Sequence, residues 1–206
     1  NISVIAGTNI NFQSSDLAIG ATAGENNYAM IGNGGRGNGE SALNTAHVGT
    51  IKVEATAGSI ALTAGQHTAA QNGNSFAQFG HGGYQARSDN SGAIDIDAGM
   101  GVTVTAGRGH QNYAHVGHGG FDADNPNTTN ATTIAASGQN QGAINLDAGG
   151  DVLFNAGDAH RAYAQFGHGG AHTRTNASGA LHLVTTGGRI EFNAGIGVDD
   201  GDTEAY

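Results

Sequence analysis

Apolar and polar residues alternate in short runs through most of the chain. The pattern is clearest where Ile94, Ile96, Val102 and Val104 are separated by Asp or Thr. An alternation with a period of two predicts β-strands that bury one face. Equivalent apolar pairs recur along the chain: Ile51 and Val53, Ile60 and Leu62, Ile144 and Leu146, Val152 and Phe154, Leu181 and Leu183, and Ile190 and Phe192. The first part of the chain is less regular, and its best matches are Ile10, Phe12 and Ile19.

An eight-residue motif follows these alternating runs four times. It reads aromatic, Ala, any residue, apolar, Gly, His or Asn, Gly, Gly, and it occupies residues 28–35, 76–83, 113–120 and 163–170. Four gapless copies indicate a tandem array, in which each repeat is one structural unit. Two alternating runs and one motif predict three short strands per unit.

The repeat units have unequal lengths. Ile51, Ile94, Ile144 and Leu181 occupy the same place in successive units and lie 43, 50 and 37 residues apart. Most of the variation falls between each motif and the next unit, in segments rich in Asn, Ser, Thr and Gly that include the only proline, Pro126. We interpret these segments as loops inserted at one corner of a regular body. The units are approximately residues 1–35, 47–83, 91–120, 141–170 and 178–206 of a single repetitive segment, 1–206.

The predicted fold is an all-β, right-handed parallel β-helix, or solenoid, with about three short strands per coil. Leu, Ile, Val and Phe together make up only about 17% of the 206 residues, which is low for an ordinary globular core. A solenoid resolves this shortage because neighbouring coils share one narrow core and pair their backbones along the whole stack. The alternative, an antiparallel sandwich, needs hairpin turns between successive strands and explains the three-strand period poorly.

Charge and composition exclude several classes of protein. The formal net charge is −10, and the seven Lys and Arg residues are scattered, which argues against nucleic-acid binding. We find no run of about 18 apolar residues that would insert into a membrane. The chain has no Cys for disulfides or thiolate metal sites. It starts without an initiator Met or a signal-peptide pattern, so we expect it to be a fragment of a longer chain.

Residues 92–107 and 142–157 resemble repeats of filamentous-haemagglutinin-like exoproteins, the large adhesins of two-partner secretion. The eight-residue motif is also similar to blocks in such exoproteins. The resemblance implies a non-catalytic stalk that is exported to the bacterial cell surface or a biofilm matrix and takes part in cell adhesion. It implies an unidentified glycan or protein receptor and no cofactor. The family's amino-terminal export domain is not found here, and we interpret Asn125-Pro126-Asn127-Thr128 as a turn.

Two alternative functions follow from the predicted surface. The acidic residues Asp95, Asp97, Asp147 and Glu54 fall on outward positions of the first strand, and stacked coils would bring some of them together. Such a stripe could serve a polysaccharide lyase, a hydrolase or a carbohydrate-binding protein, although no unit breaks the repeat to build a single site. Alternatively, the unpaired strand edges at the coil ends could join subunits end to end in an extracellular filament.

The motif places a histidine at one corner of successive coils. Alternation puts Ala164, Phe166 and His168 on the interior side and Tyr163 and Gln165 on the opposite side. The repeat-structural positions are the histidine column with its asparagine end and the preceding glycines: Asn33, His81, His118, His168, Gly80, Gly117 and Gly167. Because Asn replaces His in the first unit, we favour a neutral hydrogen-bonding ladder and expect histidine pKa values below the ordinary 6.5. A metal site at His81, His118 and His168 is the alternative.

Three Asn-x-Ser/Thr sequons fall in segments that we predict to be loops. They begin at Asn127, Asn130 and Asn176 and are candidate glycosylation sites. The run 119–124 brings to mind a calcium-binding nonapeptide but lacks its internal glycine and does not recur. The glycine-rich motifs also lack the Gly-Lys-Ser/Thr ending of a phosphate-binding loop.

Overall fold

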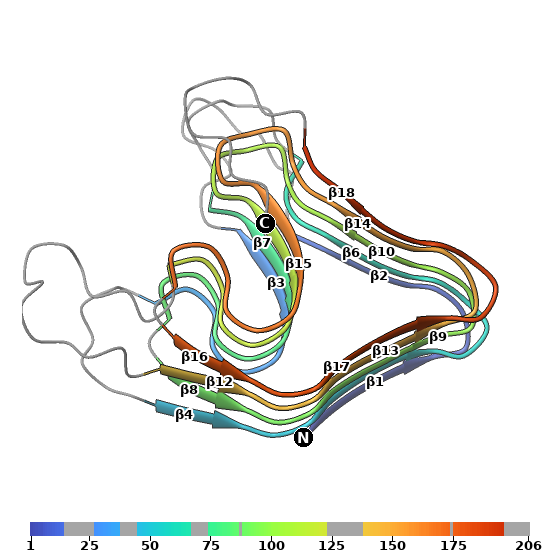
Figure 1. Ribbon diagram of the computed structural model, residues 1–206, viewed down its shortest axis with the longest axis horizontal. Coiled ribbons are helices and arrows are strands. Elements are labelled where there is room, and N and C mark those ends of the chain that lie inside the picture. The colour runs from blue at the N-terminus through green and yellow to red at the C-terminus, as the bar shows by residue number, and fades with distance from the viewer. Residues whose placement is uncertain are drawn as a thin grey trace, which may run out of the picture.

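The structure is a computed structural model that describes residues 1–14, 27–37, 45–66, 74–86, 88–122, 138–173 and 175–195. Those residues form parallel β-strands and connections, with no helix. Successive circuits of the chain lie one above another, so each strand pairs with its equivalents in the neighbouring circuits (Figure 1). The prediction of a parallel β-helix is confirmed. Because the described residues include no helix, none of them belongs to a helix that could span a membrane.

Each complete coil contributes one strand to each of four parallel sheets. The first sheet contains β1 (Ile2–Ala6), β5 (Ile51–Ala55), β9 (Ile94–Ala98), β13 (Ile144–Ala148) and β17 (Leu181–Thr185). The second contains β2 (Ile10–Gln13), β6 (Ile60–Thr63), β10 (Val102–Thr105), β14 (Val152–Asn155) and β18 (Ile190–Asn193). The third contains β3 (Tyr28–Ile31), β7 (Phe76–Phe79), β11 (Tyr113–Val116) and β15 (Tyr163–Phe166). The fourth contains β4 (Thr45–Val48), β8 (Ser88–Ser91), β12 (Gly138–Gln141) and β16 (Thr175–Ser178).

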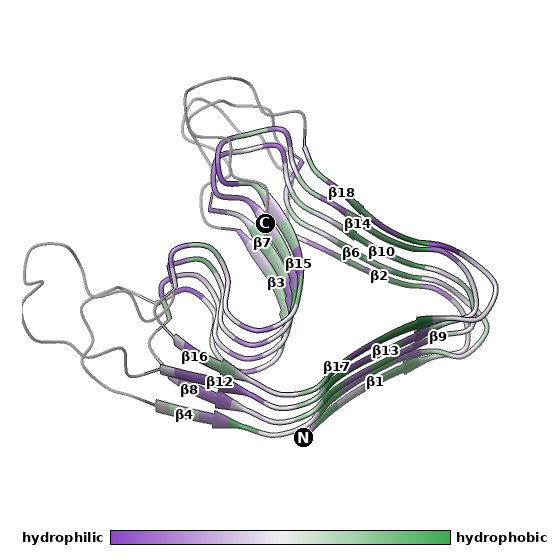
Figure 2. Ribbon diagram, viewed as in Figure 1, coloured by the Kyte–Doolittle hydropathy of each residue, from purple (hydrophilic) through white to green (hydrophobic). Residues whose placement is uncertain are grey.

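The prediction of three strands per coil is therefore wrong by one. The fourth strand lies inside the connection that we interpreted as a loop, between each motif and the next unit. Its residues are mostly Ser, Asn, Gln and Thr, so it carries no apolar alternation (Figure 2). In the first coil, Ile2–Ala6 forms the first strand and Ile10–Gln13 the second, whereas we matched the pattern at Ile10, Phe12 and Ile19; Ile19 lies outside the described residues. The fourth strand was missed because its inward face is polar.

The main core lies among the first, second and third sheets. Equivalent residues stack in exact register, as Ile51, Ile94 and Ile144 do in the first sheet. All three are fully buried, and each such side chain contributes about 1.5–3 kcal/mol on leaving water. The second sheet adds Ile60, Leu62 and their equivalents, so that a narrow apolar column runs through the coils. This shared column explains how few apolar residues suffice.

A second core covers the opposite face of the third sheet. After each motif the chain curls back in a hook before it reaches the fourth sheet (Figure 1). Tyr113 and Tyr163 are buried there at 0% and 3% exposure, packed with Tyr84 and Phe121. The prediction that the Tyr163 side of the motif faces outward is correct relative to the main core, but this face is not open to solvent, because the hook covers it. The motif aromatic residues stack with ring centroids 5.0, 4.9 and 5.1 Å apart: Tyr28, Phe76, Tyr113 and Tyr163.

The glycine before the motif histidine has a steric role between coils. Gly80 and Gly117 have φ values of 155° and 154°. A Cβ at Gly80 would overlap the carbonyl oxygen of Gly117, and one at Gly117 would overlap that of Gly167. Only glycine allows the backbones of successive rungs to approach this closely.

Candidate functional site

The three motif histidines form a stacked column beside the main core. His81 and His118 are 1% and 0% exposed, and His168 is half-buried in the fourth rung. Their ring centroids lie 4.9 Å apart between His81 and His118, and 5.0 Å apart between His118 and His168, with nearly parallel planes. The structure thus places the predicted residues in one column. Asn33 lies in the same column in the first coil, where it is exposed.

Both nitrogens of each ring are occupied by backbone groups. The N–H of His81 donates to Nδ1 of His118 at 3.0 Å, and the N–H of His118 donates to Nδ1 of His168 at 3.2 Å. The N–H of Asn33 donates in the same way to His81, at 3.0 Å. On the other side of each ring, Nε2 lies 2.9–3.0 Å from a glycine carbonyl oxygen, that of Gly49 for His81. Since a carbonyl only accepts, Nε2 carries the proton and Nδ1 is the acceptor, which defines a neutral tautomer.

Burial keeps these imidazoles uncharged. Burial is the main cause that lowers the pKa of His118 to about 3; the neighbouring histidines contribute to this shift and the Gly92 carbonyl opposes it. Burial also lowers the pKa values of His81 and His168. Protonation would add a second N–H to the ring, at Nδ1. That N–H would face the backbone N–H from which Nδ1 now accepts a hydrogen bond. The column therefore has a structural role as a ladder of neutral donors and acceptors.

Because both nitrogens of each ring already take part in hydrogen bonds, the column is poorly suited to the alternative role of a metal site. A histidine binds a metal through a free ring lone pair, and several ligands must converge on one point. Here the Nδ1 lone pairs point at backbone N–H groups, and the rings lie parallel. No group of three or more His, Asp or Glu side chains in the described ranges is arranged to hold a metal ion. Metal binding at the column would require breaking these ladder bonds.

A second buried polar row, which sequence reasoning did not identify, lies in the hook core. Gln78 and His115 occupy the variable third position of the motif, pair in register and are both fully buried. Gln78 Nε2 donates to the carbonyls of Gly117 and Gly119 at 3.0 Å, and His115 Nε2 donates to that of Gly167 at 2.6 Å. Burial lowers the pKa of His115 to about 4. These side chains join one rung to the next.

A third polar ladder runs along the fourth sheet. Asn90 Nδ2 donates to Asn140 Oδ1 at 2.8 Å, and His47 Nδ1 lies 3.1 Å from Asn90 Oδ1. Ala177 holds the equivalent position in the next rung, so the ladder ends there. Asn140 Nδ2 is buried and has no hydrogen-bond partner among the described residues. The interior of the fourth sheet is thus held by amide ladders rather than by apolar packing.

The acidic residues form a row on the outer face of the first sheet, as predicted. Glu54, Asp97 and Asp147 occupy one register position in successive rungs, beside a shallow hollow of about 250 Å³. Lys52 pairs with Glu54 at 2.8 Å, which lowers the pKa of that carboxyl. Partial burial raises the pKa of Asp97, and the carboxylate of Asp147 raises it further. In the adjacent row, Asp95 accepts a hydrogen bond from Asn145 at 2.7 Å.

The candidate glycosylation sites divide into two groups. Asn176 lies in β16 and is exposed, so the structure places this sequon on a strand and not in a loop. Asn127 and Asn130 lie outside the described residues, as does Pro126. An exposed asparagine on an edge rung remains accessible to modification.

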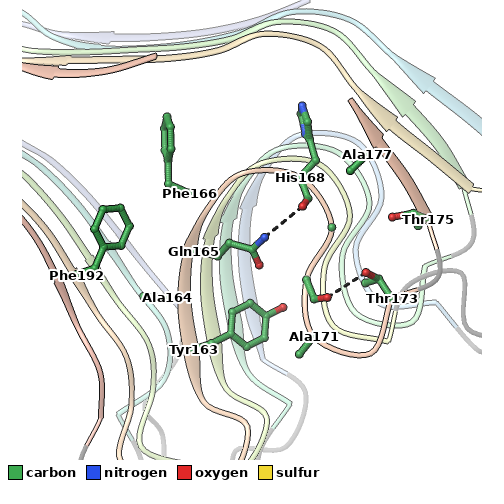
Figure 3. A pocket seen from close by; sticks show the side chains of 12 residues that line it. Tyr163, Ala164, Gln165, Phe166, His168, Ala171, Thr173, Thr175, Ala177 and Phe192 are labelled. Atoms are coloured by element: carbon green, nitrogen blue, oxygen red, sulfur yellow. Dashed lines mark hydrogen bonds between the residues drawn. The ribbon is translucent and has the colours of Figure 1, made fainter. Parts of the chain in front are cut away.

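An open groove lies above the last strand of the third sheet. It has a volume of about 580 Å³ and is bordered by β15, the hook at Gly169–Thr173, β16 and Phe192 (Figure 3). Within it, Gln165 Nε2 donates to the carbonyl of His168 at 3.2 Å. Sequence reasoning did not identify this groove, because it depends on where the stacked rungs end.

Comparison of the chain with models of protein families, with curated proteins and with solved structures finds no match.

Proposed function

We propose that the chain is a non-catalytic structural segment of a secreted, cell-surface adhesin or biofilm-matrix filament. The observation that carries this proposal is the repetition of the same contacts at successive rungs. His81 forms a hydrogen bond from Nε2 to a glycine carbonyl, and His118 and His168 form the same bond in the next two rungs. Chemistry at an active site requires an arrangement that occurs once, whereas these polar groups hold coil to coil.

The buried polar residues further support a mechanical role. The ladder bonds from rung to rung join residues that lie 37–52 positions apart in sequence, so each ties one circuit of the chain to another. Buried hydrogen bonds such as that between Asn90 and Asn140 favour one register over the others, because a slip would leave their donors and acceptors unpaired. A stack held in one register is suited to a stiff shaft. Export to the surface is supported by the resemblance of residues 92–107 and 142–157 to exoprotein repeats.

Immunolabelling of the bacterium that makes the protein tests this location. Antibodies raised against the purified chain should stain intact cells or the surrounding matrix, and brief protease treatment of intact cells should remove the signal. A cytosolic protein labelled in parallel controls for cell integrity. Staining that appears only after permeabilisation would contradict a surface function.

A carbohydrate-active or carbohydrate-binding surface is the second candidate. The observation that favours it is the row of Glu54, Asp97 and Asp147 at the hollow, where one carboxyl has a raised pKa. Carboxyl groups of different pKa are the usual acid and base pair of glycoside hydrolysis. Incubation with acidic and neutral polysaccharides should release no new reducing or unsaturated ends. Activity that is lost in Asp97→Asn or Asp147→Asn would replace the structural proposal with this one.

End-to-end association is the third candidate. Leu181, Ile190 and Phe192 are 53%, 41% and 58% exposed in the last coil, and Ile5 is 62% exposed in the first. Unpaired strand edges with exposed apolar residues favour association. Sedimentation of the purified chain over a concentration series would reveal a growing filament, whereas a single constant species would exclude it.

A further inference from the structure

Four buried polar atoms of the hook core have no hydrogen-bond partner in the part of the chain that the structure describes. They are Gln78 Oε1, His115 Nδ1 and the hydroxyl oxygens of Tyr113 and Tyr163, and all four residues are at most 3% exposed. These residues occupy the first and third motif positions of β7, β11 and β15. An unbonded polar group is costly in a protein interior, so we expect these atoms to share a partner.

Two of the four atoms are hydrogen-bond acceptors. His115 Nε2 lies 2.6 Å from the carbonyl oxygen of Gly167, so Nε2 carries the proton and Nδ1 keeps a lone pair. Burial lowers the pKa of His115 to about 4, which keeps the ring neutral at pH 7. Gln78 Nε2 donates to the carbonyls of Gly117 and Gly119 at 3.0 Å, which fixes the amide and leaves Oε1 as an acceptor.

The other two atoms belong to hydroxyl groups whose protons lack an acceptor. The Tyr113 hydroxyl oxygen lies against Gly120, 2.8 Å from where a Cβ would stand. Burial raises the pKa of Tyr113, and the backbone N–H of Phe121 opposes this shift. That N–H can only donate, so it cannot take the hydroxyl proton. Tyr163 has equivalent surroundings one rung higher.

The unpaired donor and the two unpaired acceptors lie close together without touching. Tyr113 and His115 project from the same face of β11, and their ring centroids are 6.4 Å apart. Gln78 is the register neighbour of His115 in the rung below. No direct hydrogen bond joins these three atoms, so a small molecule between them would satisfy all three. Figure 3 shows the equivalent side chains of the next rung, Tyr163 and Gln165, on the side of β15 that faces the hook.

We propose that the hook core binds a buried water molecule, which accepts a hydrogen bond from the Tyr113 hydroxyl and donates to His115 Nδ1 and Gln78 Oε1. The three atoms select this ligand by their chemistry. A metal or ammonium cation cannot accept the hydroxyl proton, and an anion such as chloride cannot donate to the two acceptors. Water does both, and a buried water makes about three hydrogen bonds. Because all three side chains are fully buried, a larger ligand has no access to them.

This site goes beyond the proposed function and does not rest on it. It gives a role to the third motif position, which appears variable in the sequence. Gln78, His115 and Gln165 all place an acceptor and a donor on the hook side of the third sheet, whereas Met30 in the first copy does not. The donor binds a backbone carbonyl, and the acceptor is available to the water. The water would thus link two rungs through their side chains.

A crystal structure of the purified chain, at a resolution that shows ordered water, tests the site directly. We expect a water molecule within hydrogen-bond distance of Tyr113 Oη, His115 Nδ1 and Gln78 Oε1. If the three atoms pair directly with one another, or remain without a common partner, the proposal is wrong. A metal ion or an anion at this point would also overturn it.

Removal of the hydroxyl tests the site in solution. Tyr113→Phe should raise the equilibrium constant of unfolding in urea about fivefold, because the water loses its hydrogen-bond donor. A hydroxyl without any partner predicts the opposite sign, since removal of an unbonded buried group is neutral or stabilising. An unchanged or lowered constant in Tyr113→Phe would overturn the proposal.

Substitution of His115 separates a bridging molecule from a local effect of the hydroxyl. His115→Gln keeps an acceptor, as Gln78 and Gln165 do, and should leave the effect of Tyr113→Phe unchanged. His115→Met, which introduces the residue found at this position in the first copy, removes the acceptor and should reduce that effect to about twofold or less. An equal effect in all three backgrounds would overturn the bridge. If a variant fails to fold, the crystal structure of the unaltered chain decides alone.

Discussion

His118 shows how a titratable residue serves as a structural part of this protein. Its ring is buried between two others, with Nδ1 accepting from the N–H of His81 at 3.0 Å and Nε2 donating to the carbonyl of Gly92 at 3.0 Å. The ladder requires the neutral ring. A group whose charged form is disfavoured on folding makes stability depend on pH.

Acid should therefore weaken the stack. The folded pKa of His118 is about 3, whereas the unfolded value is about 6.5, so the unfolded chain binds more protons between them. Stability is fully present above about pH 6.5 and falls by up to about 1.4 kcal/mol per pH unit for each such histidine down to the folded pKa. Thermal melts of the parent between pH 7.5 and 5 should show this loss.

Two variants assign the acid loss to the column. His118→Asn should melt with a smaller difference between pH 7.5 and 5 than the parent. His182→Asn, at an exposed position of β17, controls for removal of an imidazole as such. An acid loss in His118→Asn as large as the parent's would contradict the ladder.

The amide ladder of the fourth sheet ends one rung early, which predicts a stabilising substitution. Asn140 Nδ2 is buried without a partner, and Ala177 occupies the next position in register. Ala177→Asn should place an acceptor as Asn140 does for Asn90, at 2.8 Å, and stabilise the fold by about 1 kcal/mol. The midpoint of urea unfolding should rise. Ala177→Leu, of similar size but without an acceptor, should not reproduce the gain.

At the scale of the strand and its turns, the close approach of the backbones of successive rungs limits which residues the motif allows. Gly117 has a φ of 154°, and its missing Cβ leaves room for the carbonyl of Gly167. Gly117→Ala should destabilise the chain by about 3 kcal/mol or more, since the third sheet must separate or twist. Gly7→Ala is the control, because no atom lies within 4 Å of a Cβ there, and it should be neutral or slightly stabilising. Equal midpoints of denaturation for the two variants would refute the steric argument.

The first sheet carries carboxylates in rows along its outer face, and the repulsion between them lowers the stability of the fold at neutral pH. Partial burial and the carboxylates of Asp147, Glu54 and Asp95 raise the pKa of Asp97, although Lys52 opposes them. A raised folded pKa means that ionisation opposes folding, so the penalty is present at pH 7 and disappears as the pH falls through the folded pKa. Asp97→Asn should stabilise the chain by a few tenths of a kcal/mol at pH 7, after allowance for solvent screening, and not at pH 3. A loss of stability at pH 7 would show that the carboxylate is favourable.

For the molecule as a whole, the stack predicts a gradient of stability from its middle to its ends. Ile51, Ile94 and Ile144 are 0% exposed, whereas Leu181 in the last rung of the same sheet is 53% exposed. Backbone amides of β5, β9 and β13 should therefore exchange hydrogen more slowly than those of β1 and β17. Hydrogen exchange with mass spectrometry measures this directly. Uniform protection across all five strands would indicate that the ends are covered in solution.

The sequence by itself determined the strands of the first two sheets other than Ile2–Ala6, the register of the motif and the stacking of His81, His118 and His168. These features leave a local signal, because alternation and repetition can be seen within a few residues. Only the tertiary structure decided the fourth strand and the burial of Tyr113. A polar strand such as Gly138–Gln141 can be buried only when the next rung supplies its hydrogen-bond partners. The partners along this sheet lie 43 or 50 residues away, so no local pattern contains them. The motif aromatics are buried for a related reason, since the hook that covers them is positioned by contacts between coils.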